Sequence, residues 1–120
     1  IVDVFTEGLA DRYRGECPVN SLDSWQLWSQ QYDKGEYHGA HNHGMMNLSC
    51  VLYVEFDPKE HLPTTFYSPF PNPYYGTIHK AQPPVNEGEI IVFTSLLLHE
   101  APVSPSDKRR TIMSFNIPLR

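Results

Sequence analysis

The stretch NLSCVLYVEF, from Asn47 to Phe56, decides the fold of this chain. Side chains of a β-strand alternate between its two faces, so every second residue of the stretch shares a face. One face is apolar and consists of Leu48, Cys50, Leu52, Val54 and Phe56. The opposite face mixes polar and apolar side chains. The pattern predicts a core strand with one packed face.

Two histidines stand just ahead of this strand, in the sequence HNH from His41 to His43. At positions i and i+2 of an extended segment, both rings point the same way. The two rings can therefore bind one metal ion beside the core strand. For the pair alone, a histidine-rich surface turn is the competing interpretation, so the rest of the chain has to decide.

Three further segments have the pattern of strands. Residues 25–32 are rich in aromatic side chains, and Trp28, Gln30 and Tyr32 share one face of that segment. Residues 90–93 are fully apolar and are followed, six positions later, by His99. Residues 110–117 alternate, and one side of that segment carries Arg110, Ile112, Ser114 and Asn116.

The region between residues 57 and 87 holds seven of the eleven prolines. Proline cannot donate to a strand ladder, so only short strands fit here, near residues 64–67 and 77–81. The same region contains Phe66, Tyr67, Phe70, Tyr74 and Tyr75. These rings suggest either a rigid loop that packs on itself or a lid over the mouth of a pocket.

Size and composition favour a single domain of 120 residues, with a core from about residue 21 to 120 and a peripheral segment at residues 1–20 that allows a short helix. A net charge of -5 supplies no basic field, so neither nucleic acid nor an anionic membrane is an expected partner. No apolar run approaches the ~20 residues of a membrane helix, and we expect a cytoplasmic location. Cys17 and Cys50 are expected as reduced thiols, with Cys50 in the core.

Many short strands joined by glycine and proline turns predict an all-β sandwich or barrel of the jelly-roll kind. Such a barrel brings together residues that are far apart in sequence. His41, His43 and His99 would then supply three metal ligands and leave open positions for a bidentate substrate and dioxygen. Arg110 could bind a carboxylate in the same cavity. Strand parity favours Arg110 over its competitor Arg109.

Three segments resemble the Fe(II)- and 2-oxoglutarate-dependent dioxygenases with a double-stranded β-helix, particularly the prolyl-4-hydroxylase-like branch. Tyr32-x-x-Gly35 followed by His41-x-His43 is similar to the Tyr-x-x-Gly and His-x-Asp of that branch. GEIIVFTSLLLH, ending at His99, resembles the strand before the distal histidine. RTIMSFN, beginning at Arg110, resembles the strand with the basic residue that binds 2-oxoglutarate.

The resemblance implies a hydroxylase that uses Fe(II), 2-oxoglutarate and dioxygen on a C–H bond of a peptide, protein or small molecule. His41 and His99 would be iron ligands, Tyr32 would hydrogen-bond the cosubstrate, and Arg110 would pair with its distal carboxylate. His43 stands where most of the family has aspartate. We expect His43 to be the third ligand, with Glu36, Glu55 or water as the alternatives.

Two other classes remain open on the sequence alone. A cupin with three histidines, either a metal dioxygenase or a small-ligand binder, also has a Gly35-x5-His41-x-His43 segment. Against it, the glutamate expected four or five residues after His43 is absent. A structural β-barrel that merely carries histidines is the third class. We expect His38 to face away from His41, at the surface or behind the ligands, and His61 and His79 to be solvated.

Overall fold

The computed structural model describes residues 26–118, and within that range it contains β-strands and no helix. The strands are β1 (Gln26–Tyr32), β2 (His38–His41), β3 (Leu48–Glu55), β4 (Thr65–Tyr67), β5 (Lys80–Ala81), β6 (Ile90–Thr94), β7 (His99–Ala101) and β8 (Arg110–Ile117). All the segments predicted as strands form strands. The suggested helix within residues 1–20, together with Cys17, lies outside the described residues. No helix that could span a membrane is found in the described part of the chain.

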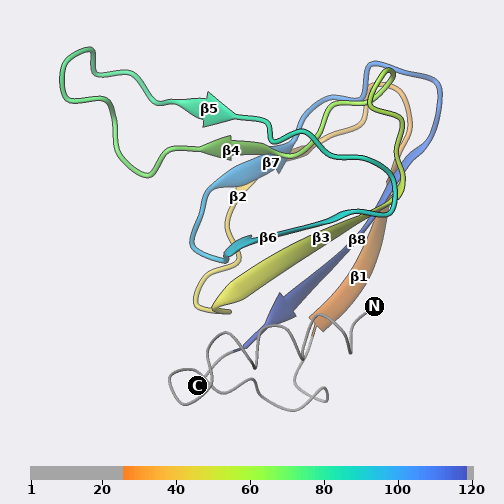
Figure 1. Ribbon diagram of the computed structural model, residues 1–120, viewed down its shortest axis with the longest axis horizontal. Helices are drawn as coiled ribbons and strands as arrows, with labels where there is room; N and C mark the ends of the chain where they lie inside the picture. The colour runs from red at the N-terminus through yellow and green to blue at the C-terminus, as the bar shows by residue number, and fades with distance from the viewer. Residues whose placement is uncertain (1–25, 119–120) are drawn as a thin grey trace.

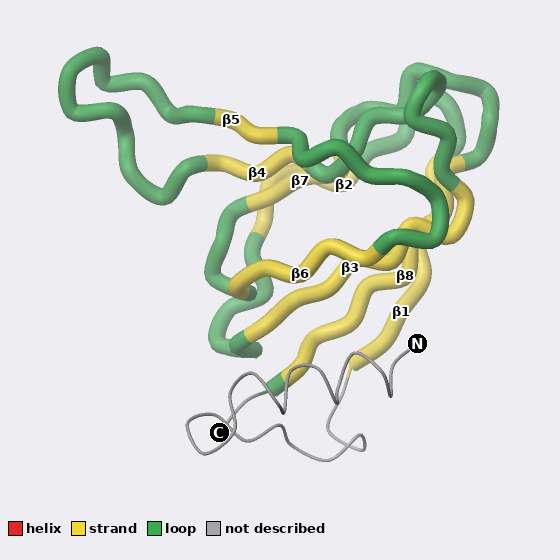
Figure 2. Tube along the Cα trace, viewed as in Figure 1, coloured by secondary structure: helices red, strands yellow, loops and turns green. Residues whose placement is uncertain are grey.

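The strands form two four-stranded antiparallel sheets that face each other, as Figures 1 and 2 show. One sheet has the order β1-β8-β3-β6 and the other β2-β7-β4-β5. Except for β4 and β5, strands that follow one another in the chain lie in opposite sheets, as β1 and β2 or β6 and β7 do. This arrangement is the predicted double-stranded β-helix.

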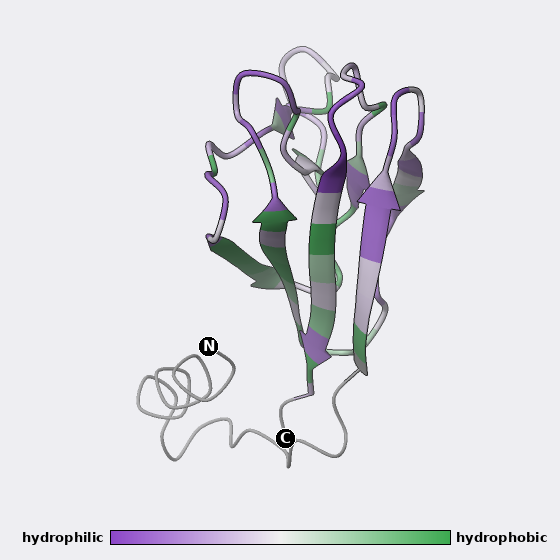
Figure 3. Ribbon diagram, turned by 90° about the vertical axis from the view of Figure 1, so that its right-hand side faces the viewer, coloured by the Kyte–Doolittle hydropathy of each residue, from purple (hydrophilic) through white to green (hydrophobic). Residues whose placement is uncertain are grey.

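Residues of the long strands fill the space between the sheets, and Figure 3 shows hydrophobic and hydrophilic residues following one another along these strands. In β8 the inward residues include Arg110 and Ile112, as the parity of the sequence predicted. In β3, Val51 and Tyr53 belong to the central cluster. Cys50 packs instead in a second buried cluster with Phe115 and Ile117. The expectation of one packed face for this strand was therefore wrong, because residues on both of its faces are buried.

The segment between β4 and β5 projects away from the barrel as a long arm (Figure 1). Phe70, Tyr74 and Tyr75 are 79%, 89% and 81% exposed, so their rings do not pack on one another. The interpretation as a loop that packs on itself was therefore wrong, and the lid stays a prediction. Local hydrogen bonds shape a turn in this arm: the side-chain oxygen of Asn72 accepts hydrogen bonds from the backbone N–H groups of Tyr74 and Tyr75.

Candidate metal centre

Three histidines from separate segments meet between the two sheets. His41 ends β2, His99 begins β7 directly opposite it, and His43 follows in the loop after β2. One nitrogen atom of each ring lies within 4.8 Å of the others. Among the described residues this is the group of three metal-binding side chains that the structure assembles, and it is the trio that the sequence predicted.

Backbone hydrogen bonds fix which nitrogen of two of these rings is free. His41 Nδ1 donates to the carbonyl of Gly39 at 2.6 Å, and His99 Nδ1 donates to the carbonyl of Leu97 at 2.8 Å. Their Nε2 lone pairs are thereby left for a ligand, which is the arrangement that outer hydrogen bonds give to metal-binding histidines.

The spacing of the rings suits a shared ion. His43 Nε2 lies 3.1 Å from His99 Nε2. Two nitrogens that each lie about 2.1 Å from one ion are separated by about 3 Å when they occupy neighbouring positions at right angles. Burial lowers the pKa of His43, and it lowers the pKa of His99 to about 4. Both rings are therefore neutral near pH 7, which is the form that binds metal.

The aromatic rings of two neighbours flank this trio. Trp28 of β1 lies 5.5 Å from the ring of His43, and His38 stacks on His41 with ring centroids 3.9 Å apart. The prediction that His38 faces away from His41 was wrong. The pairing of β2 with β7 contains a bulge between these two residues, which brings both side chains to the same face. Burial, followed by the charge of His41, lowers the pKa of His38.

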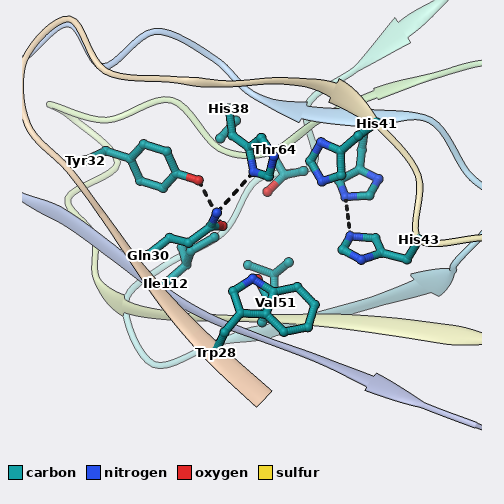
Figure 4. Close-up of a pocket in the computed structure, with 12 residues that line it drawn as sticks. Trp28, Gln30, Tyr32, His38, His41, His43, Val51, Thr64 and Ile112 are labelled. Carbon is teal, nitrogen blue, oxygen red and sulfur yellow. Dashed lines mark hydrogen bonds between the residues drawn. The ribbon is translucent and has the colours of Figure 1, made fainter. Parts of the chain in front are cut away.

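A narrow cavity runs from the histidines along the inner face of β1 and β8, and Figure 4 shows its lining. Tyr32 is buried here, and its hydroxyl donates to the side-chain carbonyl of Gln30 at 3.0 Å. The amide nitrogen of Gln30 lies 3.1 Å from His38 Nδ1. Burial raises the pKa of Tyr32, so the phenol stays protonated and can donate a hydrogen bond. Thr64 and Ile112 complete the walls of this part of the cavity.

Arg110 lies beside Tyr32, its partner in the β1–β8 register, and is only 2% exposed. Its Nε donates to the carbonyl of Leu62 at 3.2 Å, but its two terminal nitrogens are buried without a hydrogen-bond partner among the described residues. The rings of Tyr32, Tyr53 and Phe56 surround it at 5.1, 5.5 and 5.8 Å from the guanidinium carbon. Burial lowers the pKa of Arg110, and Tyr53 and Tyr32 act against that effect.

Buried arginine is normally paired, so two free terminal nitrogens in an aromatic cage indicate a position for an anion. The neighbouring Arg109 differs from Arg110 in both burial and pairing. Arg109 is exposed, and it donates two hydrogen bonds of 3.0 and 3.1 Å to Glu55. Of the two arginines, Arg110 is thus the one that is buried beside the cavity, on the face that strand parity predicted.

The acids considered as replacements for His43 are engaged elsewhere. Glu36 accepts a hydrogen bond from the backbone N–H of Asp33, and Glu55 binds Arg109 and Thr111. The geometry therefore favours His43 as the third ligand. His61 is only 3% exposed: its Nδ1 accepts from Asp57 N–H and its Nε2 donates to the carbonyl of Lys108. The expectation that His61 is solvated was wrong, whereas His79 is exposed as predicted.

Sequence reasoning missed the roles of Gln30, Tyr53 and Thr64 in this region. Gln30 was placed on the same face as Tyr32, but a lone glutamine gives no signal of a site. Tyr53 is fully buried, and its hydroxyl lies 2.6 Å from Thr64 Oγ1. The mixed face of β3 was the available signal, because polar side chains on an inward face indicate a lined cavity.

Comparison with known proteins agrees with this geometry. Residues 26–116 match a family model described as "Putative 2OG-Fe(II) oxygenase". A search of curated protein sequences found no match.

Solved structures share the fold at low identity. A prolyl-4-hydroxylase from Pseudomonas putida is 18% identical, with a TM-score of 0.63 over 98% of this chain and 61% of that one. A 2OG-Fe(II) oxygenase family oxidoreductase from Burkholderia pseudomallei is 14% identical, with a TM-score of 0.65 over 94% and 51%. A cupin domain from Bordetella pertussis is 14% identical, with a TM-score of 0.51 over 84% and 90%. The chain thus spans only part of the length of the two oxygenases.

Proposed function

The chain belongs to the 2OG-Fe(II) oxygenase family. We propose that it hydroxylates a C–H bond of its substrate with Fe(II), 2-oxoglutarate and dioxygen. The observation that carries this proposal is the separation of two complementary features. Three imidazole nitrogens face one another at one end of the cavity, and beyond the other end lies a buried guanidinium whose two terminal nitrogens have no hydrogen-bond partner among the described residues. A 2-oxo acid with a second carboxylate fits both features: its keto and adjacent carboxylate oxygens suit a metal held by the imidazoles, and its second carboxylate suits the guanidinium.

The donor set fits the implied metal. Three imidazoles suit ferrous iron, and three protein ligands leave positions for exogenous ligands. His41, His43 and His99 would hold Fe(II), and Arg110 would bind the distal carboxylate of 2-oxoglutarate. When bound, iron and cosubstrate supply the oxidising power through oxidative decarboxylation to succinate and carbon dioxide.

The remaining residues bind, orient and exclude water. Tyr32 keeps its phenolic proton, which it donates to Gln30 in this structure. To hydrogen-bond the cosubstrate, the hydroxyl would turn from Gln30 and donate that proton to the bound 2-oxo acid. Val51 and Ile112 give the cavity apolar walls, which strengthen the charge interactions inside it. Because the histidines act as ligands in this scheme, it requires no side chain as general acid or base. The proposed substrate is a peptide or protein residue or a small molecule.

A cupin-type metalloprotein is the second candidate, because three histidines without an acid also suit that class. The two candidates differ in the need for Arg110. A cupin site does not require an anion anchor, whereas an oxygenase of the proposed type depends on it.

The test is the response of the Fe(II)-loaded protein to 2-oxoglutarate without oxygen. We expect a new visible absorption band, and in air we expect slow conversion of 2-oxoglutarate to succinate. His99→Ala should abolish both signals, while His79→Ala, on the exposed arm, should leave both unchanged. Iron binding with no band and no succinate would favour the cupin, and no iron binding would reject both metal-dependent functions.

A further inference from the structure

A bulge in β2 places a fourth histidine against the proposed metal ligands. His38 pairs with Ala101 and His41 pairs with His99, so three steps along β2 match two along β7. Without the extra residue, side chains three positions apart would lie on opposite faces of the sheet. The bulge therefore has a specific effect on the site: it brings His38 to the face that carries His41.

The two rings lie nearly parallel. Their centroids are 3.9 Å apart and their planes differ by 17°. A ring that is stacked at this distance covers one face of its neighbour, so it limits rotation of the His41 side chain. The hydrogen bond from His41 Nδ1 to the Gly39 carbonyl holds the edge of the same ring. His41 is thus restrained at its edge by the backbone and on its face by His38.

His38 is itself held by a hydrogen-bond chain whose direction follows from its first donor. The hydroxyl of Tyr32 donates to Gln30 Oε1, so the amide NH2 of Gln30 is the group that faces His38. His38 Nδ1 accepts that hydrogen bond at 3.1 Å. These hydrogen bonds connect Tyr32, beside the Arg110 guanidinium, with the ring stacked on His41, and Figure 4 shows Gln30 between Tyr32 and His38.

We propose that His38 is a positioning residue that holds His41 in its metal-binding orientation, and that Gln30 acts through His38. This inference rests on the proposed metal site, but it assigns a role that the three ligands and Arg110 do not fill. Partners of ligating histidines commonly change metal affinity by about 10- to 100-fold when removed. Here the partner works through ring stacking in place of a direct hydrogen bond to the ligand.

The test uses Co²⁺ alone, whose affinity and visible absorption report the coordination of the ion without any turnover. His38→Ala should weaken Co²⁺ binding at least about tenfold. His79→Ala is the matched control, because His79 is exposed on the arm, and it should bind as the wild type does. Thermal denaturation of the metal-free proteins shows whether the His38 variant is folded.

A double-mutant cycle tests whether Gln30 acts on the metal site through His38. His38→Phe keeps a ring for stacking but cannot accept a hydrogen bond, so it should recover part of the lost affinity. Gln30→Ala should weaken Co²⁺ binding in the wild-type background and have no further effect in the His38→Phe background. These variants keep the proposal testable if the alanine variant does not fold.

The outcomes separate this inference from the proposed function. Wild-type protein that fails to bind Co²⁺ would reject the metal site itself. If the wild type binds Co²⁺ and both His38 variants bind it equally well, the metal site stands and the positioning role is wrong. Equal effects of Gln30→Ala in both backgrounds would show that Gln30 does not act through His38, and would overturn that half of the proposal.

Discussion

Replacing Arg110 with methionine should have opposite effects on stability and on cosubstrate binding. The guanidinium is 2% exposed, and no acidic side chain among the described residues pairs with it. A buried charge without a partner of opposite sign destabilises a fold. Methionine fills similar space without that charge, at the loss of one hydrogen bond to the Leu62 carbonyl and of the contacts with three rings.

The two magnitudes follow from the contacts. The lost hydrogen bond is worth about 1 kcal/mol and the three cation–π contacts, all longer than 5 Å, together about 2 kcal/mol, whereas an unpaired buried charge costs about 3–5 kcal/mol. We therefore expect metal-free Arg110→Met to be more stable than the wild type, by about 1 kcal/mol or more. Truncating one partner of a desolvated charge pair costs about 2–5 kcal/mol of binding, so the affinity for 2-oxoglutarate should fall roughly 30- to 4000-fold.

Two measurements check this prediction. Chemical denaturation gives the free energy of unfolding of the metal-free proteins, and anaerobic titration of the Fe(II)-loaded proteins with 2-oxoglutarate gives the affinity. Arg110→Lys keeps the charge but loses the fork of donors, so its affinity for 2-oxoglutarate should lie between those of the wild type and Arg110→Met. Arg109→Met is the control, since Arg109 is exposed and bound to Glu55. Unchanged affinity in Arg110→Met, or a loss of stability in the metal-free protein, would refute the reasoning.

Three further predictions concern other parts of the barrel. The hydrogen bond from its arginine partner lowers the pKa of Glu55, so the stability that Glu55 contributes is present above its unfolded pKa and disappears as the pH falls through the folded value. Glu55→Gln should therefore lower the melting temperature at pH 7, and the difference from the wild type should shrink as the pH falls below the unfolded pKa of Glu55. Burial raises the pKa of the Cys50 thiol to about 12, so in a Cys17→Ser background iodoacetamide at pH 8 should label Cys50 only after denaturation. Serine at Phe70 and Tyr74 should leave the melting temperature and the uncoupled turnover of 2-oxoglutarate unchanged, because both rings are exposed; a loss of either would show that the arm contributes to the site.

The parts of the site that could be predicted from sequence depend on regular strands. The alternation of β8 places Arg110 and Ile112 inside, and the alternation of β1 does the same for Tyr32. Where the backbone is regular, the period of two is sufficient to assign each side chain to a face of its strand. The order of the strands along the chain then brings His99 opposite His41.

The parts that could not be predicted depend on irregular backbone or on contacts between distant segments. A bulge adds one residue and reverses the face of everything before it, so counting from His41 gave the wrong side for His38. His61 is buried because the carbonyl of Lys108, 47 residues away, accepts its Nε2–H. The aromatic rings of the arm suggested a loop that packs on itself, but Asn72 forms turn hydrogen bonds with the backbone of Tyr74 and Tyr75, and these local bonds need no packing of the rings.

The replacement of an acid by His43 has an electrostatic consequence for the order in which the proposed ligands bind. Three neutral imidazoles leave the double positive charge of a ferrous ion uncompensated, and Arg110 adds a further positive charge beyond the other end of the cavity. Glu36 and Glu55 bind other groups, so neither compensates these charges. The dianion 2-oxoglutarate can meet both positive groups at once. In this protein, metal and cosubstrate should therefore strengthen each other's binding more than they would in a site with a carboxylate ligand, and by linkage the two effects must be equal in size.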